Sequence, residues 1–439
     1  MRRILLITLA VCLTFMLCLS SAFAEKELNI WYINEDCRFY YAEQKLNERY
    51  PDVTVTLEWA DDSRTFINQL FARDPSIDIV GIQDWNNGIS GRFLIRSGVL
   101  ENLNQYDNLR KIREEYNALN DLYVLEDEWF GVHSQQLIWL WYGNCSLFAE
   151  LGIEIPSSAW TWDDFYDMGK QVYQYNQEHG TNYKLIYEED MAPYVIKQYL
   201  YNTSDYAEGT HELADPRFRE LVEQWLQMRE WGVCMDVDDD NSERRDQGMA
   251  LPDTLIKVAR KSFHTGGVVD VDADIAADDA RAVYQLLIPP AEQGMHAALV
   301  RQFGMGVVSY SDLKEEALYF LECYMSKEAY LSAESMGLLN WHIKNMNGVC
   351  SPFMNNGPLY KDDPMLEKVT VPEGSWAEEN LSTWISLIAD CEGEYYDPDM
   401  AHTVCYDNTD GLRALKEGKI SLDEYIDNCC RIADQYLGE

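Results

Sequence analysis

The chain has 439 residues, of which 47% are hydrophobic, and it carries a formal net charge of −40 at pH 7. This length predicts two or three units of ordinary domain size, with enough apolar residues for real cores. Because so acidic a chain repels phosphates, we expect neither nucleic acid nor an anionic membrane surface as a partner. The charge favours solubility outside the cell, with a calcium ion or a cationic ligand as the alternative reason for it.

The N-terminus has the pattern of a secretory signal peptide. Two arginines precede an apolar run over residues 4–19, and Ala22 and Ala24 stand at the two positions that a signal peptidase recognises. Cleavage after Ala24 is expected, with a retained membrane anchor as the alternative, although the run is short for a bilayer span. Leu17 stands before Cys18 where a lipid-modified cysteine needs a small residue. We therefore expect free secretion, to the periplasm or the cell surface.

The cysteines indicate no metal site and no redox motif. Of the 11 cysteines, Cys12 and Cys18 precede the predicted cleavage site, which leaves nine in the mature chain. No Cys-x-x-Cys pair occurs, so a zinc site or a thioredoxin-like site has no support. One or two disulfides are compatible with an oxidising exterior, but the spacing does not select them.

The first part of the mature chain alternates between strand and helix patterns. Apolar or alternating runs predict strands over 28–33, 53–59 and 77–82, and helical spacing predicts helices over 39–50 and around 66–71. Strands that alternate with helices predict a parallel sheet. Ligands of open α/β sheets bind beyond the carboxyl ends of the strands. Polar and aromatic residues follow two of these ends, and we take them as candidate ligand contacts: Asn34, Glu35, Asp36, Asp84 and Trp85.

The stretch from residue 142 to residue 173 has well-marked helix boundaries. Gly152 is placed to end a first helix, and Thr161 with Asp164 has the spacing of a capping box at the start of a second. Apolar residues then recur at helical spacing, so one face of the second helix should be buried.

The motifs in this stretch carry a resemblance to a known family. Tyr142-Gly143-Asn144, then Leu147-Phe148 with Gly152-Ile153, a proline, and Thr-Trp-Asp-Asp-Phe at 161–165 resemble a signature of family 1 extracellular solute-binding proteins, the sugar-binding components of ABC importers. Gly143 interrupts the usual Tyr-Asn pair. Further segments resemble the same family in order along the chain, whereas residues 241–279 do not match it: 98–103, 283–290, 303–309, 314–330 and 418–424.

The resemblance implies an α/β, two-lobe fold of the periplasmic-binding-protein type (type II), whose lobes are joined by a two- to three-segment hinge. The first crossing is expected over residues 129–141 and the third over 341–352. The implied division of the chain is a signal peptide at 1–24, lobe 1 at 25–133, lobe 2 at 134–302, a return segment to lobe 1 at 303–345, and a C-terminal helical part of lobe 2 at 346–439.

The resemblance also implies capture of a carbohydrate, delivery to a membrane permease, and no cofactor; we expect a monomer. Tryptophan and tyrosine rings stack on the apolar faces of sugars, and polar side chains pair with the hydroxyl groups, which are costly to bury unpaired. The proposed crossings, the start of a Pro-Tyr helix and a loop of lobe 2 supply five further candidate contacts: Gln135, Gln136, Tyr194, Trp341 and Trp376.

Two other functions stay open. The same fold could carry a non-sugar solute or act as a sensor, and a secreted glycosidase is the enzyme alternative, since acidic residues abound. The sequence contains no Gly-x-Ser-x-Gly, His-Glu-x-x-His or phosphate-loop motif, so we expect no enzyme. The acidic run 236–241 imitates a calcium loop only in part, because Asn241 replaces the glycine of such loops and Gln247 the final glutamate. A solvated loop is the expected reading there and for Asp270, Asp272 and Asp274.

Overall fold

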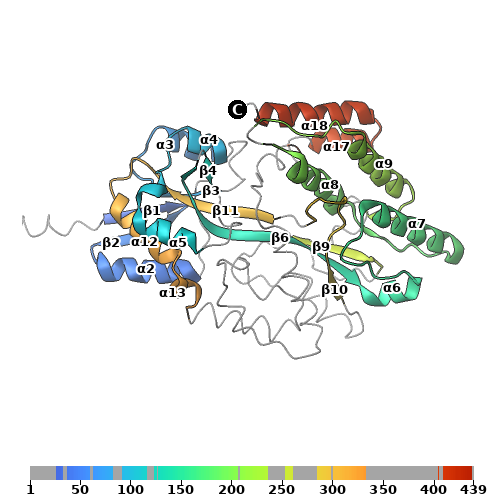
Figure 1. The fold of residues 1–439 in the computed structure, drawn as a ribbon, viewed down its shortest axis with the longest axis horizontal. Helices are drawn as coiled ribbons and strands as arrows, with labels where there is room; N and C mark the ends of the chain where they lie inside the picture. Colours follow the sequence, from blue (N-terminus) through green and yellow to red (C-terminus); the bar gives the residue numbers. More distant parts are fainter. Residues whose placement is uncertain are drawn as a thin grey trace, which may run out of the picture.

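The structure is a computed structural model. The residues it describes are 26–32, 37–59, 63–82, 91–115, 123–125, 127–205, 208–235, 253–260, 284–297, 300–332, 404 and 409–437. Their helices and strands form two groups, which lie at the left and the right of Figure 1. The group that contains the N-terminal strands is called lobe 1, and the other group is called lobe 2.

Lobe 1 is built on the parallel sheet that the sequence predicts. Its strands are β1 (Lys26–Trp31), β2 (Val53–Glu58) and β3 (Ile79–Ile82), with β1 between the other two. Leu28 and Ile30 of β1 are fully buried, because the helices cover the sheet. The helices and short elements of this part are α2 (Cys37–Arg49), α3 (Ser63–Phe71), α4 (Gly91–Arg96), η1 (Leu103–Gln105), α5 (Asp107–Glu114), β4 (Val124–Leu125) and β5 (Glu128–Trp129).

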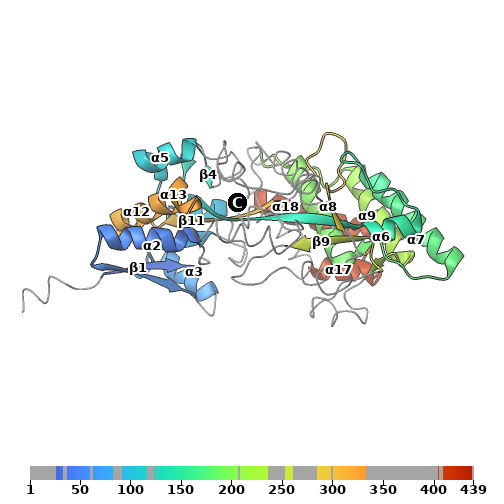
Figure 2. The same ribbon diagram turned by 90° about the horizontal axis from the view of Figure 1, so that it is seen from below.

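Two long strands run between the lobes. β6 (Val132–Asn144) pairs through residues 132–138 with β11 (Val300–Val307), which in turn pairs with β3 of lobe 1. Beyond that stretch, residues 139–144 of β6 pair with β9 (Ile256–Arg260) and β10 (Tyr284–Leu287) of lobe 2. The same strand therefore belongs to the sheets of both lobes, and Figure 2 shows it spanning the distance between them. The crossing expected over residues 129–141 is confirmed.

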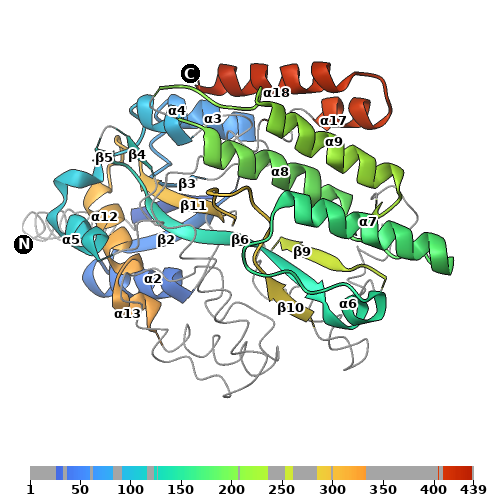
Figure 3. The same ribbon diagram turned by 45° about the vertical axis from the view of Figure 1, so that its right-hand side comes forward.

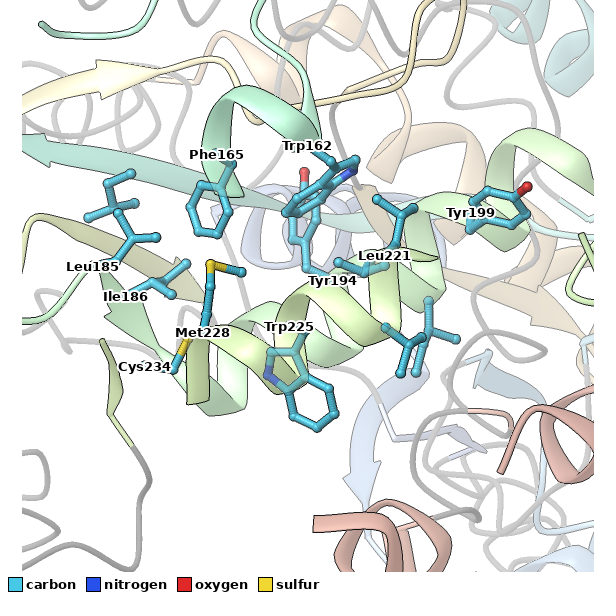
Figure 4. Close-up of a cluster of buried hydrophobic side chains, with 14 of the residues drawn as sticks. Trp162, Phe165, Leu185, Ile186, Tyr194, Tyr199, Leu221, Trp225, Met228 and Cys234 are labelled. Atoms are coloured by element: carbon cyan, nitrogen blue, oxygen red, sulfur yellow. The ribbon is translucent and has the colours of Figure 1, made fainter. Parts of the chain in front are cut away.

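Lobe 2 is mainly helical around the far half of β6. Its core joins tryptophan, tyrosine and aliphatic side chains from several helices and from β7 (Ile186–Tyr187) and β8 (Cys234–Met235), and Figure 4 shows part of this cluster. Figure 3 shows the two C-terminal helices lying outside the longer helices of this lobe, away from β9 and β10. The helices are α6 (Cys145–Leu151), α7 (Trp162–His179), α8 (Glu188–Thr203), α9 (Pro216–Glu230), α17 (Thr409–Lys416) and α18 (Leu422–Leu437).

The ends of α6 and α7 have the predicted geometry. Gly152 adopts a left-handed conformation with φ +67° and ends α6. At the start of α7, the Thr161 hydroxyl accepts from the Asp164 backbone N–H at 3.2 Å, and the Asp164 carboxylate accepts from the Thr161 backbone N–H at 2.7 Å. This reciprocal pair is a complete capping box, so the sequence alone located the start of the helix.

Replacing Thr161 by alanine removes the side-chain acceptor from this cap. We expect the free energy of unfolding to fall by about 0.5–2 kcal/mol, as for other N-cap threonines. Urea denaturation of Thr161→Ala and of Thr161→Ser measures it. The serine variant keeps the hydroxyl, so it should retain most of the stability; an equal loss in both variants would contradict the capping role.

The chain returns to lobe 1 and then leaves it again. α12 (Lys314–Tyr324) and α13 (Lys327–Tyr330) pack on α2, with the rings of Phe39 and Phe320 5.4 Å apart. The C-terminal helices instead belong to the core of lobe 2, where Val404 is fully buried. A third passage between the lobes therefore lies between α13 and residue 404; the segment predicted for it, 341–352, is outside the described residues. The predicted lobe boundaries stay predictions, since β6 contributes to both lobes.

A buried carboxylate ties three parts of lobe 1 together. Asp78 is 2% exposed, and its side chain accepts from the Asn29 backbone N–H at 2.9 Å and from the Ser311 hydroxyl at 2.5 Å. These bonds connect the start of β3 to β1 and to the loop before α12. Burial raises the pKa of the Asp78 carboxyl above its ordinary value, although both hydrogen bonds act in the opposite direction.

The raised pKa of Asp78 predicts a measurable dependence of stability on pH. A carboxyl group whose pKa is higher in the folded state binds its proton more tightly there, so its contribution is fully present below the unfolded pKa and is lost as pH rises through the folded pKa. Wild type should therefore gain stability relative to Asp78→Asn as pH falls from neutral toward the ordinary aspartate value of 3.8. Paired urea titrations across that range measure the difference. A difference that is constant with pH, or that grows in the opposite direction, would contradict the assignment.

Candidate functional site

The parallel strands of lobe 1 point toward lobe 2. β3 and β6 are both antiparallel to β11, so they run in the same direction. β6 runs from lobe 1 into lobe 2, and β1 and β2 are parallel to β3 through β1. The carboxyl ends of all three lobe 1 strands consequently face lobe 2.

The strands of lobe 2 point back in the opposite direction. β9 and β10 are both antiparallel to β6, so their carboxyl ends face lobe 1. Helix α8 begins directly after β7, which is parallel to β9 through a bridge between Lys184 and Thr254, so its N-terminus also lies on that side. The carboxyl ends of the strands in the two lobes therefore face each other, and the region between them is here called the inter-lobe face. This is where ligands of open α/β sheets bind.

Seven of the ten predicted contact residues cannot be compared with the structure. These residues are outside the described part of the chain, so their contact with a ligand stays a prediction: Asn34, Glu35, Asp36, Asp84, Trp85, Trp341 and Trp376. The expected loop at 236–241 and the acidic residues 270–274 lie outside it as well. Among the described residues, no cluster of three His, Cys, Asp or Glu side chains could hold a metal ion.

Gln135 and Gln136 lie on the crossing itself. Their backbones pair with Phe303 and Gln302 of β11, next to a register irregularity between Phe303 and Gly304. Both residues therefore occupy the stretch of β6 that joins the lobes, as the resemblance implies. Their contact with a ligand stays a prediction.

Tyr194 lies in the core of lobe 2. Its side chain is 2% exposed, its ring lies 5.1 Å from that of Trp141, and its hydroxyl donates to the Ala297 carbonyl at 2.7 Å. The helix does not begin at Pro193, as the sequence pattern suggests, but at Glu188. In this conformation the hydroxyl is engaged with the protein, so ligand contact by Tyr194, which stays a prediction, needs a rearrangement of the segment before β11.

The segment that leads back to β11 is held by the polar side of α8. The Gln198 amide donates to the carbonyls of Pro290 and Ala297, each at 2.9 Å, and accepts from the indole N–H of Trp162 at 2.7 Å. Asn202 exchanges two hydrogen bonds with the His296 backbone. These bonds, of which those of Gln198 are fully buried, fix the start of the return crossing to lobe 2.

One aromatic residue at the inter-lobe face was not among the sequence candidates. Trp59 directly follows β2, and its side chain is 51% exposed. Its ring lies 5.2 Å from that of Tyr32, which directly follows β1 and has φ +60°. The alternating pattern of residues 53–59 accounts for Trp59 as the last residue of a strand. For that reason the sequence did not mark it as a ligand contact. The usable signal was an aromatic residue directly at a strand exit, as at Trp85.

No protein-family model and no curated protein matches the sequence. Solved structures do match it over nearly its whole length. An ABC substrate-binding protein from Listeria monocytogenes, in complex with cycloalternan, is 12% identical with a TM-score of 0.63, over 94% of this chain and 99% of that one. The sugar-binding protein MalE from Xanthomonas citri is 13% identical with a TM-score of 0.64, over 94% and 98%.

A third structure carries the name of the family that the sequence resembles. The family 1 extracellular solute-binding protein from Bifidobacterium longum subsp. infantis is 13% identical with a TM-score of 0.61, over 93% of this chain and 98% of that one. Among the described residues, no helix is long and apolar enough to cross a membrane. The fold of this chain is that of the family 1 extracellular solute-binding proteins, two α/β lobes joined by crossing strands.

Proposed function

We propose that this chain is an extracytoplasmic solute-binding protein that captures an oligosaccharide between its lobes and delivers it to the permease of an ABC importer. The observation that carries the proposal is the inter-lobe face, where the strands of both lobes present their carboxyl ends to each other. A solute held there contacts both lobes at once. Of the similar structures, one is a sugar-binding protein and one is a complex with cycloalternan, which supports a carbohydrate as the solute.

The mechanism is capture by closure, and it makes or breaks no covalent bond. A ligand that contacts both lobes only when they are close together shifts the equilibrium toward the closed form by its difference in affinity for the two forms. The two described crossings, β6 and β11, are the segments that such a movement has to bend. The closed form would then dock on the permease.

We further propose how the chain is processed after secretion and which residues contact the ligand. The signal peptide is removed after Ala24, and the mature protein acts as a monomer at the periplasm or cell surface. The ten candidate contacts supply rings that stack on sugar faces and polar groups that pair with hydroxyls: Asn34, Glu35, Asp36, Asp84, Trp85, Gln135, Gln136, Tyr194, Trp341 and Trp376.

Thermal unfolding of residues 25–439 tests the proposal. The panel contains α-1,4-glucans, β-1,4-glucans, β-1,4-xylans and β-1,4-mannans from one to six rings, together with polyamines and Ca²⁺. A ligand at 100 times its dissociation constant adds about 2.7 kcal/mol of stability, which shifts the midpoint clearly. A shift with one saccharide series, together with compaction in solution scattering and no release of reducing sugar, is the expected result.

The other outcomes separate the alternatives. A shift with a cation or polyamine alone would keep the fold and reject the carbohydrate. Release of reducing sugar would make the protein a glycosidase. If a saccharide raises the unfolding midpoint but solution scattering shows no compaction, closure is rejected as the mechanism of capture.

A further inference from the structure

Trp59 differs from the other tryptophans in lobe 1 and lobe 2. Among the tryptophan side chains that the structure describes, it is the one that is mostly open to solvent, whereas five others are buried in the cores: Trp129, Trp141, Trp160, Trp162 and Trp225. An indole left in water keeps a large apolar surface unburied. A single exposed apolar side chain is common, so the position and support of Trp59 have to carry the inference.

The ring of Trp59 is supported from within lobe 1. Tyr32, which is 5% exposed, touches it edge to face with centroids 5.2 Å apart, and the Tyr32 ring in turn lies 4.7 Å from that of Phe66 on α3. This row of rings connects the exposed indole to the buried cluster of α3 and β3. A ring braced in this way loses little conformational freedom when a ligand stacks on it, so less of the binding energy is lost to ordering.

The place of Trp59 in the sheet sets a length for the ligand. The strand order is β11, β3, β1, β2, so Trp59 at the end of β2 is three strand spacings from the crossing strand β11. At about 4.8 Å per spacing, this separation is about 14 Å. A single sugar ring that lies at the crossing strands cannot also reach Trp59, whereas a chain of several rings can.

We propose that Trp59 is the outer stacking platform of the binding site, which binds the apolar face of a distal ring and so selects oligosaccharides over short sugars. Tyr32 is a positioning residue that holds the indole in place. This inference rests on the proposed function. It adds a minimum length for the oligosaccharide and names Trp59 as the residue that selects for that length.

The test compares affinities along the saccharide series that binds the wild-type protein in the thermal panel, from the disaccharide to the hexasaccharide, by calorimetry. Trp59→Ala should weaken binding of the hexasaccharide about tenfold or more, and a tenfold change in the dissociation constant corresponds to 1.4 kcal/mol. It should leave the disaccharide within about twofold of wild type. The affinity of Trp59→Phe for the hexasaccharide should lie between those of wild type and Trp59→Ala, because the smaller ring retains part of the stacking surface.

Ile155 offers a matched control. It is 38% exposed and lies in the loop between α6 and α7 of lobe 2, whereas Trp59 belongs to lobe 1. Ile155→Ala should therefore bind every length as wild type does. If Trp59→Ala weakens all lengths equally, or none, Trp59 is no length-selective platform and the inference is wrong while the proposed function stands. If wild type itself binds no saccharide, the proposed function fails and the inference fails with it.

Discussion

Trp141→Ala is expected to lower the free energy of unfolding by about 3–5 kcal/mol, the range found when a buried aromatic side chain is truncated to alanine. Trp141 is fully buried at the point where β6 enters lobe 2. The rings of Phe165 and Tyr194 lie 5.7 Å and 5.1 Å from it, both edge to face, and two further tryptophans also pack against it. Its removal would leave a cavity that this rigid cluster cannot close.

Trp141→Phe is the matched control for this prediction. Among the described residues, the indole N–H of Trp141 has no hydrogen-bond partner, so phenylalanine removes a buried donor while it keeps an aromatic ring in place. We expect it to cost clearly less than alanine. Urea denaturation followed by circular dichroism measures both variants. Equal losses for the two would mean that the aromatic contacts do not account for the stability at this site.

Gly304→Ala is expected to be the second most damaging change, with a loss of about 1–3 kcal/mol, as is typical of overpacking in a filled interior. Gly304 lies on β11 beside the register irregularity of the crossing strands. A Cβ atom there would overlap Cε2 of Tyr123 and would lie 2.8 Å from its Cδ2 and 3.0 Å from the Val132 carbonyl oxygen. Glycine is needed at this position because the Tyr123 ring and Val132 of β6 approach the backbone of β11 closely.

A double-mutant cycle with Tyr123 tests this explanation. The Tyr123 hydroxyl donates to the Ile82 carbonyl at 3.0 Å, so the ring closes over β3, β6 and β11 together. In a Tyr123→Ala background, the added methyl group should cost less, because only the contact with the Val132 carbonyl remains. The coupling energy from urea denaturation measures this difference. Independent, additive losses would show that the ring does not determine the cost at Gly304.

Trp141 and Gly304 both lie on strands that join the two lobes. Trp141 anchors β6 in the core of lobe 2, and Tyr123 packs over the other end of the crossing in lobe 1. In the proposed function, closure of the lobes acts on a strand whose two ends are packed in this way, so bending has to occur in the stretch between them. Variants at either end should therefore also alter the ligand-induced compaction that the proposed function requires.

Features that depend on neighbouring residues could be predicted from the sequence. The capping box at Thr161, the left-handed end of α6 at Gly152 and the alternation of β2 are local, because each rests on bonds or side-chain spacing within a few residues. The strand–helix alternation of lobe 1 likewise predicted a parallel sheet, and the order of the family-like motifs predicted two lobes.

Features in which distant segments meet could not be predicted, because they arise only in the folded chain. The start of α8 at Glu188, before Pro193, follows from its place directly after β7 in lobe 2 rather than from the proline signal. The Tyr194 hydroxyl finds its acceptor at Ala297, and the ring of Trp59 is supported by Tyr32, which follows a different strand. No local pattern encodes these contacts, because long-range packing determines that Tyr194 is buried and that Trp59 stays exposed at the end of β2.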